Sequence, residues 1–248
     1  SMMMTFLVGL EGGIHNTMYF VLPGLLVFGY MMHFMPEYKR VNIEHALKQA
    51  TAKAKQEAAK LSYFGLGLLL FFIFMRSTIH TGMSTYLPLF FMKFRDCEPV
   101  FASLLVTVFL LGGVAGTYIG AVLSDRLGAR AIIFGSMVLS IPPIWALDMV
   151  YIEFAIVAAV GLAGFFIIGS NATTIVLAQT MLPNNVGMAA GLTIGFSVGL
   201  GGLGVTILGV LADNFGLPFV IQLLTWLSIG SALVTLKIPI PESMRKKF

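Results

Sequence analysis

The chain has 248 residues, of which 58% are hydrophobic and 10% are charged, and its mean hydropathy is +0.93. A soluble domain carries about 25% charged residues and needs helices with polar faces, so this composition excludes an ordinary soluble protein. The net charge is +4, but the basic residues stand between apolar runs rather than among surface aromatics, which argues against a nucleic-acid partner.

Seven apolar runs are long enough to cross a lipid bilayer, which takes about 20 residues of α-helix. They cover residues 18–35, 64–91, 100–123, 131–149, 154–181, 186–211 and 219–236. The predicted fold class is therefore all-α, a polytopic bundle of transmembrane helices in the plasma membrane. A shorter apolar piece, 6–10, looks like the end of a helix whose beginning is missing.

Residues 37–62 are rich in Ala, Lys, Gln and Glu, and Glu44 stands four residues before Lys48, a spacing that supports a helix. We expect a linker helix at the cytoplasmic membrane surface. It divides the chain into one leading span (1–36), the linker (37–62) and a six-helix domain (63–248). A single leading span suggests a truncated parent protein.

The loop charges predict the orientation, because Lys and Arg in short loops stay preferentially in the cytoplasm. Six basic residues lie in the linker, Arg126 and Arg130 follow the third span, and four more lie from Lys237 onward. All of these fall on one side of the membrane, whereas the other side has only Lys93 and Arg95. We therefore expect a cytoplasmic carboxyl terminus.

Two parts of the six-helix domain share a short sequence pattern. Residues 123–128 (LSDRLG) and 211–216 (LADNFG) share the pattern L-[SA]-D-x-[LF]-G three spans apart. Three crossings invert the side of the membrane, as inverted three-helix repeats in transporters require. Six letters can also match by chance.

Glycines recur at every fourth position at the start of the run 186–211, at Gly187, Gly191, Gly195 and Gly199. Such a stripe lets two helix backbones approach closely in lipid. It indicates either static helix packing or a surface that slides during transport.

Arg76 and His80 stand four residues apart inside an apolar run, so both project from one face of a helix. An Arg near mid-membrane costs about 2.5 to 3.5 kcal/mol on insertion scales and usually marks a substrate or proton path. Histidine, with an ordinary pKa near 6.5, exchanges protons in the physiological range. We expect roles in transport or proton coupling; the alternative is a structural pair.

Asn171 and Gln179 are polar residues within the run 154–181, where amides line a substrate path or simply join helices. Cys97 is the only cysteine, so neither an intrachain disulfide nor a cysteine zinc site can form. Phosphate-loop and HExxH motifs are absent from the sequence. We therefore expect no enzyme, no cofactor and no metal.

Residues 120–130 (GAVLSDRLGAR) resemble the major facilitator superfamily motif G-x-L-[AS]-D-R-x-G-x-R, offset by one residue at its first glycine. The resemblance implies that this loop forms a charge network with neighbouring helix ends and controls the inward and outward states. The matching residues are Gly120, Asp125, Arg126, Gly128 and Arg130. The alternative is a plain cytoplasmic turn.

Two further stretches, 76–88 and 183–192, look like the seventh helix and the loop into the eleventh helix of the fosmidomycin resistance group of drug exporters. This resemblance implies proton-driven export of small molecules by a twelve-helix protein, whose amino-terminal half would be the chain's partner. Lipid, substrate and proton are the other expected partners. The competing hypothesis is a truncated or structural membrane protein without transport activity of its own.

Overall fold

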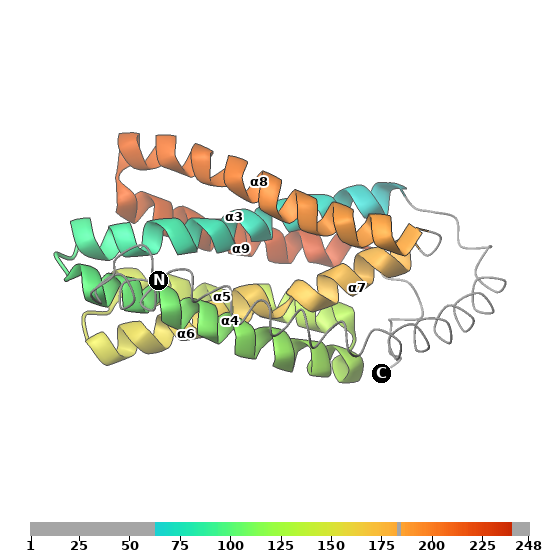
Figure 1. Ribbon diagram of the computed structural model, residues 1–248, viewed down its shortest axis with the longest axis horizontal. Helices are drawn as coiled ribbons and strands as arrows, with labels where there is room; N and C mark the ends of the chain where they lie inside the picture. Colours follow the sequence, from blue (N-terminus) through green and yellow to red (C-terminus); the bar gives the residue numbers. More distant parts are fainter. Residues whose placement is uncertain (1–62, 183–184, 240–248) are drawn as a thin grey trace, which may run out of the picture. The chain divides into compact units, whose positions relative to one another are not determined.

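The computed structural model describes residues 63–182 and 185–239, which lie in one compact unit, Leu61–Phe248. The described part is helical, without strands, and is drawn in Figure 1. Its helices are α3 (Tyr63–Lys93), α4 (Pro99–Leu127), α5 (Ala129–Met149), α6 (Glu153–Gly169), α7 (Asn171–Met181), α8 (Val186–Phe215) and α9 (Leu217–Lys237). The expected leading span 18–35 and the linker 37–62 lie outside the described residues.

Within the described part, six helices are long and apolar enough to cross a membrane, because α6 and α7 form one span, Glu153–Met181. All six spans expected between residues 64 and 236 are present, and the all-helical polytopic fold class is confirmed. Two spans run further than expected: α4 ends at Leu127 and α8 at Phe215. Their last turns include Asp125 and Asp213, and each helix ends only where a glycine follows.

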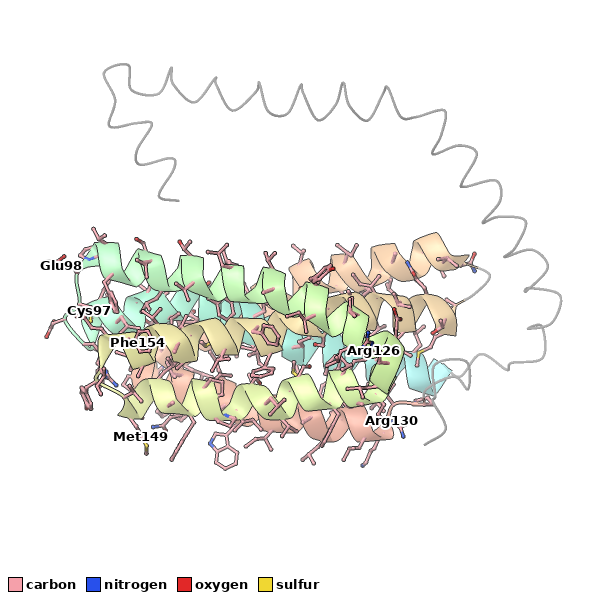
Figure 2. All side chains as sticks on the ribbon, turned by 90° about the horizontal axis from the view of Figure 1, so that it is seen from below. Cys97, Glu98, Arg126, Arg130, Met149 and Phe154 are labelled. Atoms are coloured by element: carbon pink, nitrogen blue, oxygen red, sulfur yellow. The ribbon has the colours of Figure 1, made fainter. Side chains whose placement is uncertain are left out.

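The helices connect alternately at two ends of the bundle. The α3–α4, α5–α6 and α8–α9 connections share one end, here called the Arg95 end, and the α4–α5 and α7–α8 connections share the other, the Arg130 end. Figure 2 shows Cys97, Glu98, Met149 and Phe154 at the first end and Arg126 and Arg130 at the second. The predicted charge asymmetry is therefore an asymmetry between two ends of one bundle.

The bundle consists of two repeats related by a shift of 88 residues. This shift carries α4 onto α8 and α5 onto α9, and it carries α3 onto the α6–α7 span to within two residues. It also carries Gly128 (φ 89°, ψ 152°) onto Gly216 (φ 85°, ψ 165°), and each of these glycines separates two helices. The short sequence pattern shared by 123–128 and 211–216 therefore belongs to a repeat of three whole spans, and the two repeats have opposite orientations in the bundle.

Two apolar clusters fill the bundle, and a polar layer lies between them. On α3, Ile73 belongs to the cluster near the Arg130 end and Ile79 to the cluster near the Arg95 end. The same change of cluster occurs on α5, on the α6–α7 span, on α8 and on α9. The buried polar residues between the clusters are Arg76, Ser77, Thr78, Ser140, Ser170, Thr173, Thr174, Thr193, Thr225, Ser228 and Ser231.

Candidate functional site

Most hydroxyls of the polar layer bond to a carbonyl within their own helix. Thr78 donates to Phe74, Thr193 donates to Ala189 and Ser228 donates to Leu224 at 2.8 to 3.1 Å. Such bonds satisfy a hydroxyl in an apolar environment without requiring a partner helix. The cross-helix bonds of the layer converge instead on Arg76 and its neighbour Ser77.

Arg76 lies near the middle of α3, about 20 Å along the axis from one helix end and about 26 Å from the other. Its side chain is only 3% exposed. One guanidinium nitrogen, Nη2, donates to Oδ1 of Asn171 at 3.1 Å and to Oγ of Ser197 at 3.5 Å. The cation therefore links α3 to both α7 and α8 at the depth of the polar layer.

Small residues on α8 allow it to lie against α3 at this level. Oγ of Ser77 donates to the carbonyl of Ser197, and Oγ of Ser197 donates to Oγ of Ser77 at 3.2 Å. A Cβ on Gly201 would lie 2.6 Å from Oγ of Ser77, and one on Gly204 would collide with Thr78. These two glycines therefore set the separation between α3 and α8.

The interruption between α6 and α7 brings Asn171 to the guanidinium. The α-helix stops at Gly169, Ser170 forms a turn, and Asn171 begins the next helix. A Gly–Ser pair is a common cause of a helix kink, and Gly169 lies close to α4, since a Cβ there would be 3.1 Å from the carbonyl oxygen of Gly116. The side chain of Asn171, one of the predicted polar site residues, therefore lies beside Arg76.

Three buried polar atoms of this layer have no hydrogen-bond partner among the described residues. They are Nε of Arg76, Oγ of Ser170 and Oγ1 of Thr173. A buried polar group without a partner costs about 1 to 3 kcal/mol, and more when it is charged. These three atoms therefore keep hydrogen-bonding capacity that the described residues do not use.

His80 lies one turn from Arg76 on the same helix, on the side of the Arg95 end. Its ring stacks on Phe109 of α4 with centroids 5.9 Å apart and an interplanar angle of 25°. The side chain is half-buried, and within residues 63–182 and 185–239 no hydrogen bond to the imidazole is formed. Arg76 and His80 thus share a stretch of α3, but Arg76 bonds to α7 and α8 whereas His80 packs on α4.

The remaining predicted site residues lie away from this layer. Gln179 is near the end of α7, half-buried and without a described partner. Asp125 and Arg126 are exposed at the Arg130 end of α4 and form no ion pair within the described part. Arg130 donates to the carbonyl of Ile238, just beyond α9, at 2.7 Å. One residue of the predicted motif 120–130 therefore contacts a neighbouring helix end.

The motif glycine Gly120 lies beside α6, where a Cβ would collide with the carbonyl of Gly169. Gly112 and Gly116 meet Gly161 and Phe165 of α6 in the same way. Three glycines of α4, Gly112, Gly116 and Gly120, therefore form a close backbone contact with α6.

The longer glycine stripe of α8 faces open space. Gly187, Gly191, Gly195 and Gly199 are all exposed, and a Cβ on any of them would have no atom of the described residues within 4 Å. Helix packing on this stripe stays a prediction, and within the described bundle α8 packs through Gly201 and Gly204 instead.

Two members of the site, Ser77 and Ser197, are not apparent from the sequence. A single serine in an apolar helix usually bonds to its own backbone, so neither residue carries a signal by itself. The available clue is the small-residue pattern around Gly201 and Gly204, which indicates a close helix neighbour.

Comparison with known proteins gives two similar proteins, while no protein-family model matches the chain. The chain is similar to the fosmidomycin resistance protein of Escherichia coli strain K12, 27% identical over 234 residues, which are 93% of this chain and 56% of that protein. It is also similar to YfnC, an uncharacterized MFS-type transporter of Bacillus subtilis strain 168, 33% identical over 57% of this chain and 34% of that protein.

The chain spans about half or less of the length of these relatives. The 234 matched residues also exceed the 186 residues from 63 to 248, so the similarity extends into the first 62 residues. The resemblance to the major facilitator superfamily, and within it to the fosmidomycin resistance group, is confirmed by these similarities.

Proposed function

We propose that this chain is the carboxyl-terminal half of a secondary active transporter that exports a small molecule or drug in exchange for protons. Residues 63–248 form the transport half, residues 1–36 contribute the last helix of the other half, and residues 37–62 form the cytoplasmic linker. The similarity to a fosmidomycin resistance protein supports this proposal. A transport role leaves no enzymatic step to assign.

The observation that carries the proposal is Arg76, a buried cation in mid-span without a counter-ion among the described residues. Every described carboxylate lies in a loop or within three residues of a helix end. A buried charge without a counter-ion is costly and marks a functional path more often than a structural one. We assign Arg76, held by Asn171 and Ser197, to an anionic group of the substrate, with Nε as a free donor; Gln179 lies further along the same path.

His80 is the residue we assign to proton exchange. The fixed charge of Arg76 lies one turn away, so protonation of His80 raises the local charge from about +1 to about +2. The affinity of this region for an anionic group then depends on whether His80 carries a proton, and by linkage the proton affinity depends on the bound group. Coupling of substrate to proton requires such a dependence.

The other half of the transporter is the partner we assign to the exposed face of α8. Among the six spans, α8 and α4 are the least buried, and these two helices are related by the shift of 88 residues. The stripe Gly187, Gly191, Gly195 and Gly199 lies on this uncovered helix. A close helix contact across the stripe would place the two halves on either side of the substrate path.

The Arg130 end is the end we place in the cytoplasm, together with the carboxyl terminus, in the plasma membrane. It carries Arg126, Arg130 and Lys237 against one described acid, Asp125. The bond from Arg130 to the end of α9 is a contact that one state can keep and another can break, so we assign Asp125, Arg126, Gly128 and Arg130 to gating.

The test measures efflux of fosmidomycin from vesicles under an imposed pH gradient, with the chain alone and with the amino-terminal half of its parent protein. We expect efflux only with both halves, its loss in Arg76→Gln, and loss of the pH dependence in His80→Gln. Glu153→Gln, which removes an exposed charge at the Arg95 end, is the control. Unchanged coupling in the Arg76 and His80 variants would remove their assigned roles, and no efflux with both halves would favour a structural protein.

A further inference from the structure

A cavity lies at the Arg95 end of the bundle, away from the polar layer. The end of α3, the end of α8 and the start of α9 line an open cavity of about 770 Å³, within the range of about 300 to 1,000 Å³ that small-molecule sites occupy. These helix ends lie at the left in Figure 1, where α8 turns into α9. The cavity is large enough for an organic ligand.

Two opposite charges line this cavity without neutralising each other. Lys93 ends α3 and Asp213 lies in the last turn of α8, and both line the cavity. No ion pair joins them within the part of the chain that the structure describes, and both side chains are exposed. The wall therefore offers a cation and an anion at the same time.

The remaining lining is apolar, with one phenol. Leu89, Phe94 and Leu217 contribute the apolar surface. Tyr86 donates its hydroxyl proton to the carbonyl of Val205 at 2.8 Å, so its oxygen keeps its acceptor capacity. A Cβ on Gly209 would lie 3.0 Å from that oxygen, so the absence of a side chain at position 209 keeps the space beside the phenol open.

We propose that this cavity binds a zwitterionic amphiphile. Its anionic oxygens bond to Lys93, its ammonium group bonds to Asp213, and its apolar part lies on Leu89 and Leu217. Phe94 and Phe215, which are exposed and also line the cavity, extend its apolar surface. Two sources carry this chemistry: the headgroup of a zwitterionic phospholipid, and a free zwitterion in the aqueous phase.

The experiment measures binding to the purified full chain in detergent, by native mass spectrometry and by competition titration. The probes are dihexanoyl phosphatidylethanolamine, which carries both charges and short chains, O-phosphoethanolamine, which lacks the chains, and dihexanoyl phosphatidylglycerol, which lacks the ammonium group. We expect saturable binding of the phosphatidylethanolamine and affinity for the phosphatidylglycerol that is lower on the order of tenfold. Equal affinity for both lipids, or no saturable binding, overturns the proposal.

The second arm identifies the source. Binding of the phosphatidylethanolamine without binding of phosphoethanolamine assigns the site to a membrane lipid. Binding of both probes assigns it to a free zwitterion. Each result supports the zwitterion site, whereas binding of neither contradicts it.

Variants locate the binding. We expect Lys93→Gln and Asp213→Asn each to weaken binding on the order of tenfold, and Lys93→Arg to retain it. Glu153→Gln, which removes an exposed acid at the same end but outside the cavity, is the control. Gly209→Ala, which keeps both charges and narrows the space beside Tyr86, should also weaken binding. An unaltered affinity in the first two variants, with the fold verified by size-exclusion elution, overturns the site.

Discussion

The guanidinium of Arg76 on α3 lies 3.5 Å from the hydroxyl of Ser197 on α8, and the equivalent positions on α6 and α4 form a close backbone contact. The shift of 88 residues carries Arg76 onto Gly164 and Phe109 onto Ser197. Gly164 packs so closely on Phe109 that a Cβ would collide with the carbonyl of Phe109. The contact between α3 and α8 is therefore polar, whereas the equivalent contact between α6 and α4 is a close backbone contact.

The two acceptors of Arg76 lie at different distances, and this difference predicts unequal effects when each acceptor is removed. Asn171→Ala removes the shorter of the two described acceptors and leaves a buried cation short of a partner, so we expect a loss of about 1.5 to 3 kcal/mol of stability. Ser197→Ala removes a bond at 3.5 Å and should cost less. Unfolding of the purified chain in a lipid-like detergent, followed by intrinsic fluorescence, measures both.

Gln179→Ala is the matched control for Asn171→Ala, because Gln179 is an amide on the same helix without a described partner. Equal destabilisation by the two alanines would show that the bond to Arg76 contributes nothing particular to folding.

The contacts of Arg95 predict a second stability effect, at the Arg95 end of the bundle. Its guanidinium donates to the carbonyls of Leu147, Asp148 and Val150 at 2.7 to 2.9 Å and lies 4.1 Å from the ring centroid of Tyr151. A cation at the carboxyl end of α5 bonds to its free carbonyls and interacts favourably with the helix dipole. We expect Arg95→Gln to lower the free energy of unfolding by about 2 kcal/mol.

The control for this change is Arg126→Gln, which removes the same charge from an exposed position without a described partner. Thermal unfolding of both variants in one detergent gives the comparison. A melting temperature that falls equally in both would mean that the cap at α5 is not what Arg95 contributes.

Arg95 also shows what the sequence could and could not predict. The spans follow from apolar length alone, and the fold class was predicted correctly from it. From the sequence, Arg95 is only one of two basic residues on the side of the membrane opposite the cytoplasm. Its use as a helix cap depends on where α5 ends in space. The break at Ser170 and the pairing of Arg76 with Ser197 likewise depend on contacts between helices far apart in the sequence, which no local pattern encodes.

The contact between α4 and α6 predicts that small additions are not tolerated there. A Cβ at Gly116 would collide with the carbonyl of Phe165, which belongs to a backbone and cannot rotate away. Overpacking of this kind costs about 1 to 3 kcal/mol. We expect Gly116→Ala to destabilise the bundle and Gly195→Ala, whose Cβ would meet nothing within 4 Å, to leave the stability of this chain unchanged. Melting temperatures in detergent decide between the two, and equal values would contradict the close contact.

The orientation can be read with the single native cysteine. Cys97 lies at the Arg95 end, between α3 and α4, and Figure 2 shows it opposite Arg126. We expect a membrane-impermeant maleimide added to intact cells to label Cys97. In Cys97→Ser carrying Arg126→Cys, labelling should require permeabilised cells. Labelling of position 126 from outside would reverse the proposed orientation.

The two glycines at equivalent positions of the repeats give the sharpest stability prediction, since both hold a backbone conformation that other residues avoid. Gly128 and Gly216 have φ of 89° and 85° with ψ of 152° and 165°, a region that is essentially restricted to glycine and costs other residues on the order of 1 to 3 kcal/mol. Each glycine is the single residue between two helices, so the strain cannot relax without moving a span. We expect Gly128→Ala and Gly216→Ala to lose similar stability, because the repeat gives both the same geometry. Gly135→Ala, inside α5 with open space around its Cβ, should be neutral or stabilising. If Gly135→Ala lowers the melting temperature as much as the other two, the shared backbone conformation is not what these glycines provide.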